Sequence, residues 1–287
     1  MINFQLFAVT QNGLQVLPVP PEATTFEELY PGLSLGVYSA LRTFEHNRFL
    51  DLDAHLARTY QSMRLLGWDY PFDETAFRQG LHDACTHFPF AEARVRFDVL
   101  AAAAAPLGTD SRVLIALQPF NPPTQEMITN GVKLGFAPTL HRDEPLIKRA
   151  DFPLKRRIYP IGGPEAYENL LTDEAGYLLE GTSSNFYAVK AGVFRTAGDG
   201  VLEGITRKII LGLLPGLGIP CRLEAVRLDE VGELDEAGIS SASRALLPVV
   251  QIGEQVIGTG KPGPICQRIL AVYNAYVAEH VKLAVEE

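Results

Sequence analysis

The chain of 287 residues is long enough for one large domain or two ordinary ones, and 47% of its residues are hydrophobic. A net charge of −9 argues against a nucleic-acid partner, because binding to phosphates needs a concentrated basic face. The spacing of Cys85, Cys221 and Cys266 suits neither a disulfide framework nor a zinc site, and no apolar run reaches the roughly 20 residues of a membrane helix. We therefore expect a cytoplasmic protein with no metal, nucleic-acid or membrane partner.

The first part of the chain predicts a hairpin, further strands and two helices. Apolar and polar residues alternate in INFQLFAV and LQVLPV on either side of an Asn12-Gly13 turn, which is typical of a β-hairpin. From Leu52 the apolar residues recur at helical spacing, and a second helix is predicted from Asp73 to His87. ARVRFDVLAAAAA and DSRVLIALQPF then predict two strands, although the alanine run has a high helix propensity.

Residues 119–126, PFNPPTQE, predict a linker because three prolines interrupt both helix and strand. After it, GVKLGFAP predicts a strand and ENLLTDEAGYLLEGTSSNFYAVKAGVFRT a meander of short strands. Helices are predicted in GITRKIILGLL, LDEVGELDEAGIS and PICQRILAVYNAYVAEHV. The predicted fold class is α+β with mixed or antiparallel sheets. The predicted domains are 1–118 and 129–287, joined by a linker at 119–128.

Several polar residues precede apolar segments and are candidates for chemistry. Glu180, in EGTSSNFYAV, and Lys148, in LIKRADF, fit solvated surface charges when each is considered alone. Arg58 similarly fits the charged face of the first helix. In EGITRKII, Gly204 precedes Thr206 at a helix start, where free backbone N–H groups suit a phosphate; an ordinary N-cap is the alternative.

Together these segments resemble the fold-type IV pyridoxal-phosphate enzymes, the class IV aminotransferase family of branched-chain aminotransferase, D-amino-acid transaminase and aminodeoxychorismate lyase. The segments occur in the family's order: GVYSALRTF, DLDAHLARTYQSM, LIKRADF, DEAGYLLEGTSSNFYAV, LEGITRKIIL, SSASRALLPVV and GPICQRIL. The resemblance implies a smaller N-terminal α/β domain and a larger C-terminal domain with a mixed or antiparallel barrel-like sheet. It also implies pyridoxal 5'-phosphate as the cofactor and a homodimer.

The resemblance further implies a role for each candidate. Lys148 would be the Schiff-base lysine, which forms an aldimine and shuttles a proton as base and acid. Its separation from Glu180, 180 − 148 = 32 residues, agrees with the family's spacing. Glu180 would pair with the protonated pyridine nitrogen. Arg58 would bind the phosphate, helped by the backbone amides of Ile205 and Thr206 and the Thr206 hydroxyl.

Two positions depart from the family's pattern. Pro153 stands where many relatives carry a tyrosine, so either another group such as Tyr159 replaces it or the cofactor linkage has unusual electronics. Ala242 stands where the family has a phosphate-binding threonine, and the flanking Ser241 and Ser243 are its candidate replacements.

The substrate side is less readable from the sequence. Tyr38 aligns with a residue that faces the substrate in family members, and Arg94 and Arg96 fall on one face of a strand. An arginine there could bind a substrate carboxylate through two hydrogen bonds, or merely form a salt bridge with Glu92 or Asp98. Five alanines replace the arginine-glycine pair of some D-amino-acid transaminases, which weakens a D-amino-acid assignment.

The resemblance predicts a pyridoxal-phosphate-dependent aminotransferase that moves an amino group between an amino acid and a 2-oxo acid. Two alternatives stay open. One is aminodeoxychorismate lyase, which eliminates pyruvate in 4-aminobenzoate synthesis. The other is a degenerate cofactor-binding relative with little activity, which Pro153 and Ala242 motivate.

Overall fold

The computed structural model describes residues 4–163 and 165–285, and the chain divides into two compact units. The first unit comprises Met1–Asn121, Ile147–Leu154 and His280–Glu287; the second comprises Pro122–Leu146 and Lys155–Glu279. The chain first passes between the units at 121–122, inside the predicted linker segment 119–128. Each unit therefore combines segments that are far apart in the sequence.

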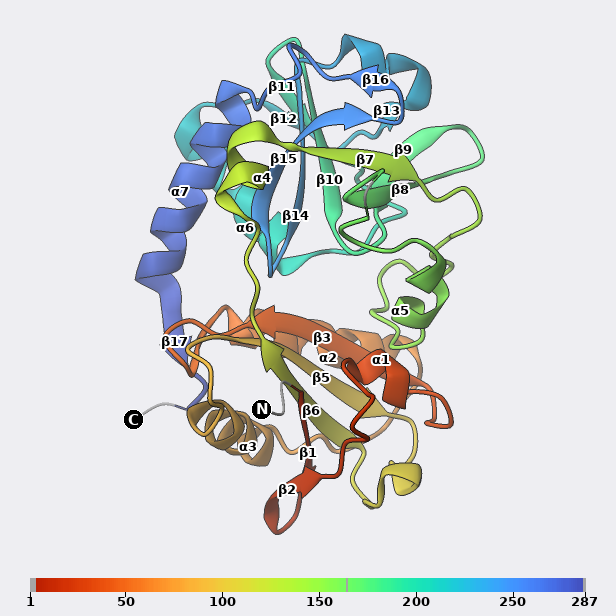
Figure 1. Cartoon of the computed structure of the whole chain (residues 1–287), viewed down its shortest axis with the longest axis vertical. Coiled ribbons are helices and arrows are strands. Elements are labelled where there is room, and N and C mark those ends of the chain that lie inside the picture. The colour runs from red at the N-terminus through yellow and green to blue at the C-terminus, as the bar shows by residue number, and fades with distance from the viewer. Residues whose placement is uncertain (1–3, 164, 286–287) are drawn as a thin grey trace. The chain divides into compact units, whose positions relative to one another are not determined.

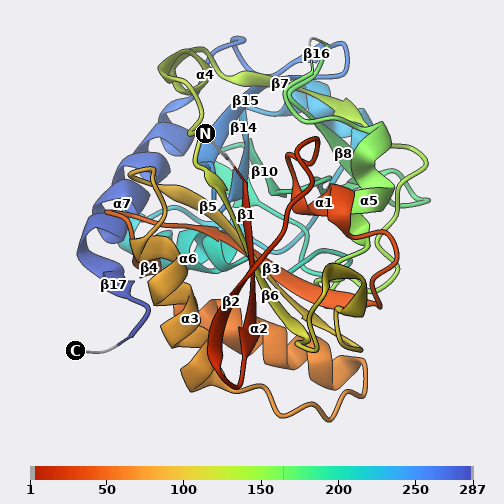
Figure 2. The same ribbon diagram turned by 60° about the horizontal axis from the view of Figure 1, so that its bottom comes forward.

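The first unit contains a five-stranded antiparallel sheet in the order β2-β1-β6-β5-β3 (Figures 1 and 2). The predicted N-terminal hairpin and both helices are confirmed, with Thr10 opposite Gly13 at the hairpin turn. The elements are β1 (Gln5–Thr10), β2 (Gly13–Leu17), α1 (Phe26–Leu29), β3 (Gly36–Arg42), β4 (Arg48–Leu50), α2 (Leu52–Leu65), α3 (Glu74–Thr86), β5 (Ala93–Leu100), β6 (Val113–Pro119) and β17 (Val281–Leu283). β17 pairs with β4, and α5 (Phe152–Lys155) lies where the chain leaves this unit.

The alanine run at 101–105 is not a strand, so that prediction is wrong. β5 ends at Leu100, and Ala105–Leu107 forms a 3₁₀ turn with a proline in it. Most of these alanines are exposed. Because the exposed alanines bury so little apolar surface, packing does not favour a continued strand, and Pro106 cannot donate a ladder hydrogen bond.

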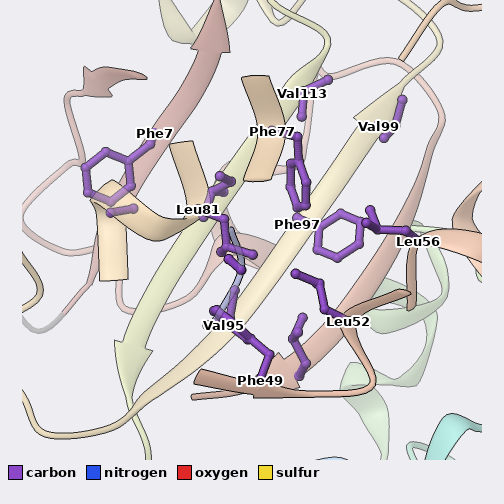
Figure 3. Close-up of a cluster of buried hydrophobic side chains, with 14 of the residues drawn as sticks. Phe7, Phe49, Leu52, Leu56, Phe77, Leu81, Val95, Phe97, Val99 and Val113 are labelled. Carbon is purple, nitrogen blue, oxygen red and sulfur yellow. The ribbon is translucent and has the colours of Figure 1, made fainter. Parts of the chain in front are cut away.

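Alternate residues of the sheet build one core with α2 and α3. Phe77 of α3 lies 4.7 Å from Phe97 of β5, ring centroid to ring centroid (Figure 3). Both are fully buried, as are Leu56 and Leu81 around them. Burying each such side chain stabilises the fold by about 1.5–3 kcal/mol. Around these residues cluster Phe7, Phe49, Leu52, Val95, Val99 and Val113.

Backbone pairing explains why Ile147–Leu154 belongs to the first unit. Val37 of β3 forms an antiparallel bridge with Arg149, and the amide of Tyr38 donates to the Lys148 carbonyl at 2.9 Å. The segment therefore extends the sheet beside β3. A segment this short has no periodicity by which the sequence could have predicted that pairing.

The second unit is built on a closed, barrel-like sheet. Its strands run in the order β10-β14-β15-β7-β8-β9, and β9 pairs back to β10 (Figure 1). β7 is parallel to β15 and to β8, whereas the other barrel pairings are antiparallel, so the sheet is mixed as predicted. The six strands are β7 (Val132–Phe136), β8 (Glu168–Thr172), β9 (Tyr177–Gly181), β10 (Asn185–Lys190), β14 (Glu236–Ser241) and β15 (Ala245–Ile252).

Short strands and helices surround this barrel, and the predicted helices at 205 and 264 are confirmed. The helices are α4 (Gln125–Asn130), α6 (Ile205–Leu213) and α7 (Pro264–His280), and the short strands are β11 (Val193–Arg195), β12 (Cys221–Arg222), β13 (Val226–Arg227) and β16 (Gln255–Val256). Further 3₁₀ turns lie at Arg156–Ile158, Pro215–Leu217 and Leu228–Glu233. Within residues 4–163 and 165–285, the helices are too short or too polar to cross a membrane.

Candidate active site

Arg58 of the first unit lies on a buried polar stripe of α2. Its Nη2 donates to Ser39 Oγ at 2.9 Å, and Ser39 Oγ lies 2.8 Å from Nδ1 of His55, one helical turn before Arg58. All three residues are buried. Burial, and then the positive charges of Arg58 and Lys148, lower the pKa of His55 well below 6.5. His55 is therefore neutral near pH 7. Ser39, which itself contacts His55, orients the Arg58 guanidinium.

Lys148 is fixed through its backbone between β3 and α2. Its carbonyl accepts from Tyr38, and its amide donates to Ser62 Oγ at 3.3 Å. The side chain is partly buried, and Nζ lies 4.6 Å from the centroid of the Tyr38 ring. The structure thus brings two of the sequence-predicted residues, Lys148 and Tyr38, side by side within the first unit.

Arg94 and Arg96 lie on the same face of β5 but in different environments. Arg94 is exposed, whereas Arg96 is buried and donates two 2.8 Å hydrogen bonds to Asp98 and one of 3.1 Å to Glu27. Burial opposes the charge of Arg96, but the adjacent Asp98 outweighs it and raises the pKa of Arg96. The guanidinium also lies 4.3 Å from the centroid of the Tyr38 ring. This geometry favours the internal salt bridge over a substrate carboxylate as the partner of Arg96.

Glu180 of the second unit is the next-to-last residue of β9 and pairs with Asn185 of β10, where the barrel closes. The carboxylate is only 2% exposed, so the interpretation of a solvated strand-end charge is wrong. It accepts from Arg142 Nε at 2.6 Å, Asn185 Nδ2 at 3.2 Å and the Leu202 amide at 3.1 Å. Because a carboxylate has about four lone-pair positions, roughly one remains for a further N–H donor.

Asn185 links the N-terminus of α6 to this carboxylate, because its Nδ2 donates to Glu180 and its Oδ1 lies against Gly204. Gly204 is the N-cap residue and makes no side-chain cap, and Ile205 and Thr206, the first two helical residues, are buried. A Cβ atom added to Gly204 would lie 2.1 Å from Asn185 Oδ1, so the close approach requires glycine. Open amides at the positive end of a helix are typical of a phosphate site.

Ser241, the last residue of β14, and Ser243 lie at the turn that joins β14 and β15. The turn is closed by the amide of Arg244, which donates to the Ser241 carbonyl at 3.0 Å, and both serines are partly buried. Asn185 pairs with Ser240, the residue before this turn, and α6 packs against β14. The second unit therefore gathers the Glu180 carboxylate, the α6 N-terminus and this turn at one end of the barrel.

Tyr159 is already hydrogen-bonded within the second unit. Its hydroxyl lies 2.7 Å from Thr139 Oγ1 and accepts from the Thr139 amide at 3.3 Å. Pro153 is buried in α5. Replacement of the family tyrosine by Tyr159 stays a prediction. To take that role, the Tyr159 hydroxyl would have to give up its hydrogen bonds to Thr139.

Sequence reasoning missed three residues that organise these sites: Arg142, Glu168 and Arg244. Arg142 is the ion-pair partner of Glu180 but precedes it by 38 residues in a loop without periodicity. Glu168 and Arg244 form a buried ion pair with N–O 2.9 Å across 76 residues. The only available signal was a charged residue next to an apolar strand, which is too common to single out any of them.

Comparisons with known proteins agree with this fold. A family model described as amino-transferase class IV matches residues 36–153 and 162–252. A D-alanine aminotransferase from Bacillus licheniformis is 29% identical over 261 residues, which cover 86% of this chain and 89% of that protein.

Solved structures extend the comparison to nearly the whole chain. A putative branched-chain amino acid aminotransferase from Thermotoga maritima has a TM-score of 0.77 at 23% identity, covering 96% of each chain. A branched-chain amino acid aminotransferase from T.th., solved with pyridoxamine 5'-phosphate, has a TM-score of 0.80 at 20% identity, covering 98% of each chain. The predicted two-domain fold of the type IV class is confirmed.

Proposed function

Because the chain belongs to the class IV aminotransferase family, we propose that it moves an amino group between an amino acid and a 2-oxo acid with pyridoxal phosphate. Members of this family are pyridoxal-phosphate-dependent transferases. The observation that carries the proposal is Glu180, a buried carboxylate that three donors orient and that keeps about one lone-pair position for a ligand.

The residues present fit the three polar parts of pyridoxal phosphate. An aldehyde needs an amine, a pyridine nitrogen needs an anion that stabilises its protonated form, and a phosphate needs N–H donors. Lys148 supplies the amine, Glu180 the anion, and the α6 N-terminus with Arg58 the donors. When bound, the cofactor supplies an electron sink for the charge that develops at the substrate Cα.

Each of these residues then has a defined task. Lys148 Nζ would hold the cofactor at its aldehyde carbon and would move the substrate proton as general base and acid. Glu180 would pair with the protonated ring nitrogen, and Arg142 orients its carboxylate through the 2.6 Å hydrogen bond from Nε. Arg58 and the amides of Ile205 and Thr206 bind the phosphate, with Thr206, Ser241 and Ser243 as further hydroxyl donors.

On the substrate side, the position of Tyr38 against Lys148 Nζ supports Tyr38 as a substrate-facing residue. Of the two arginines, Arg94 is the candidate for a substrate carboxylate because it is exposed, whereas Arg96 is buried and donates to Asp98 and Glu27. Because the relatives are named for D-alanine and for branched-chain amino acids, both donor classes belong in the first assay.

The first test is covalent trapping of the cofactor. Wild-type protein incubated with pyridoxal phosphate and reduced with borohydride should carry the label on Lys148, as peptide mass spectrometry would show. Lys148→Ala should lose both the label and amino transfer, whereas Lys155→Ala, a matched exposed lysine, should keep them. Label that persists on another lysine in Lys148→Ala would show the assignment is wrong.

A donor panel tests the reaction itself. With D-alanine or branched-chain donors, the absorbance of the bound aldehyde form should give way to that of the pyridoxamine form. Release of pyruvate from aminodeoxychorismate without this change would instead indicate a lyase, and wild-type protein that takes up no pyridoxal phosphate would overturn the proposal.

We also propose that the chain forms a homodimer, as the family resemblance implies. Sedimentation at several protein concentrations should give twice the 31.4 kDa mass of the chain. A sedimenting monomer with full activity would contradict this.

A further inference from the structure

Glu168 of β8 is a fully buried carboxylate that the proposed reaction does not use. Its Oε1 accepts from the Ser183 amide, from Ser183 Oγ at 2.9 Å and from Thr182 Oγ1 at 3.3 Å. Its Oε2 accepts from Ser184 Oγ at 3.1 Å. An isolated buried carboxylate costs several kcal/mol, and these donors offset that cost. One side chain thus binds every residue from 182 to 184.

The turn bound by Glu168 is the one that separates Glu180 from Asn185. It leaves little room, because a Cβ atom added to Gly181 would lie 2.3 Å from Ser184 Oγ and 2.7 Å from Glu168 Oε1. Both ends of the turn carry residues of the candidate site. Any shift of Glu168 would therefore move the Glu180 carboxylate or its partner Asn185.

Arg244 links the same carboxylate to a second turn. From the turn between β14 and β15, Nη1 donates to Glu168 Oε2 at 2.9 Å and Nη2 donates to Ser183 Oγ at 2.7 Å. Nε donates to Tyr167 OH at 2.9 Å, and the guanidinium lies 5.3 Å from the centroid of that ring. Ser183 Oγ in turn donates a hydrogen bond to Glu168 Oε1, so three side chains close a ring of hydrogen bonds. Arg244 is 9% exposed and Glu168 is not exposed at all.

We propose that Glu168 and Arg244 are a positioning pair that sets the separation between two cofactor-binding turns of the second unit. One turn presents Glu180 to the ring nitrogen, and the other presents Ser241 and Ser243 to the phosphate. This inference rests on the proposed function. A buried ion pair is often no more stabilising than apolar residues of the same volume. We therefore assign Glu168 and Arg244 a role in orienting the two turns through directed hydrogen bonds, rather than a role in stability.

The experiment compares Arg244→Met, Glu168→Gln and the double variant with the wild type. Removing a residue that orients a first layer of ligands typically costs about 10- to 100-fold in affinity at metal sites, and we expect the lower end of that range here. Each single variant should raise the Kd for pyridoxal phosphate about tenfold. The double variant should be no worse than the weaker-binding single variant, because both act through one link.

Further readouts separate positioning from simple destabilisation. At saturating cofactor, both variants should lower kcat with little change in KM for the donor, because Glu180 is misplaced while the substrate-facing residues of the first unit are intact. Arg244→Lys keeps the charge but not the fork of donors, and should recover only part of the affinity. If Arg244→Met does not fold, Arg244→Lys and Glu168→Gln carry the test.

Lys190→Met is the matched control, since it breaks ion pairs with Glu230 and Glu233 at the other end of β10. It should leave the Kd and kcat unchanged. Lower thermal stability with Kd and kcat within twofold of wild type for both Arg244→Met and Glu168→Gln would overturn the positioning role. A wild type that binds no pyridoxal phosphate would overturn the proposed function, and with it this role.

Discussion

Two helices of the second unit begin after a glycine against which a buried side chain packs, but only one helix is capped. At α7, Glu236 accepts from the amides of Ile265 and Cys266 at 2.9 and 2.8 Å. A Cβ atom added to Gly263 would lie 2.1 Å from the Glu236 carboxyl carbon. At α6, the residue against Gly204 is Asn185, which is neutral. A carboxylate thus occupies the positive end of α7, whereas the positive end of α6 has no side-chain cap.

The second unit places its buried carboxylates differently at the two helix starts. Asn185 Nδ2 donates to Glu180 and, at 2.8 Å, to the Leu202 carbonyl. The Asn185 amide group therefore binds the carboxylate and does not cap α6 with a negative charge. Glu236 stabilises the helix whose end it occupies, by the charge–dipole effect and two hydrogen bonds. We infer that the capped terminus is structural and the open one is reserved for an anionic ligand.

The largest effect should follow from adding one methyl group at the open terminus. Gly204→Ala places Cβ against Asn185 Oδ1, and because that amide orients Glu180, relief of the overlap disturbs both the phosphate end and the ring-nitrogen end of the site. Overpacking of this kind costs about 1–3 kcal/mol. If this cost falls on the bound state, the Kd for pyridoxal phosphate rises about 5- to 150-fold, which titration of the apoprotein would measure.

Gly212→Ala is the matched control, because it lies in the same helix with open space around its Cα. It should leave the Kd unchanged and raise stability by about 0.5–1 kcal/mol, since alanine is the better helix former. If Gly204→Ala binds cofactor as tightly as Gly212→Ala does, the open terminus of α6 is not the phosphate site.

The capped terminus should respond in the opposite way. In Glu236→Gln, the amide oxygen can accept from one of the two α7 amides, but the NH₂ group then faces the other donor. A buried donor left unsatisfied costs about 1–3 kcal/mol, so we expect a loss of about 2 kcal/mol in the free energy of unfolding. The Kd for pyridoxal phosphate should stay within twofold of wild type. Denaturant unfolding of the apoprotein and cofactor titration together check this, and a stable variant with weakened binding would reverse the comparison.

The elements on which this comparison depends were predictable where a local period marks them. The helical spacing after Leu52 and the glycine-hydroxyl start at 204–206 correctly located α2 and α6. The alternation of apolar residues likewise predicted the hairpin at Asn12-Gly13. Such periods record which face of an element is buried, and they need no knowledge of its neighbours.

The partners of the buried charges were not predictable, since a single charged residue leaves no period. Arg142, Glu168 and Glu236 look like surface residues in the sequence. Glu168 and Glu236 are buried and Arg142 is partly buried, and each meets donors or a counter-charge supplied from 29 to 76 residues away. The family resemblance indicated Lys148 and Glu180, but it did not reveal what orients them.

The smallest expected effect concerns His55 of the first unit, a buried imidazole that its surroundings keep uncharged. The unfolded chain takes up a proton on His55 near pH 6.5, whereas burial and the charges of Arg58 and Lys148 hold the pKa of His55 well below that value in the folded protein. Stability that is fully present above pH 6.5 is therefore lost as the pH falls below it, by up to about 1.4 kcal/mol per pH unit.

His55→Asn removes this titration while its amide oxygen can still accept from Ser39. Between pH 6.5 and 5, its free energy of unfolding should fall less steeply than that of the wild type, by up to about 1.4 kcal/mol per unit. His87→Asn, at the exposed end of α3, is the matched control. Equal slopes for wild type and His55→Asn would mean that His55 binds a proton as readily in the folded protein as in the unfolded chain. The contrast between a charged Arg58 and a neutral His55 on one helix face would then be wrong.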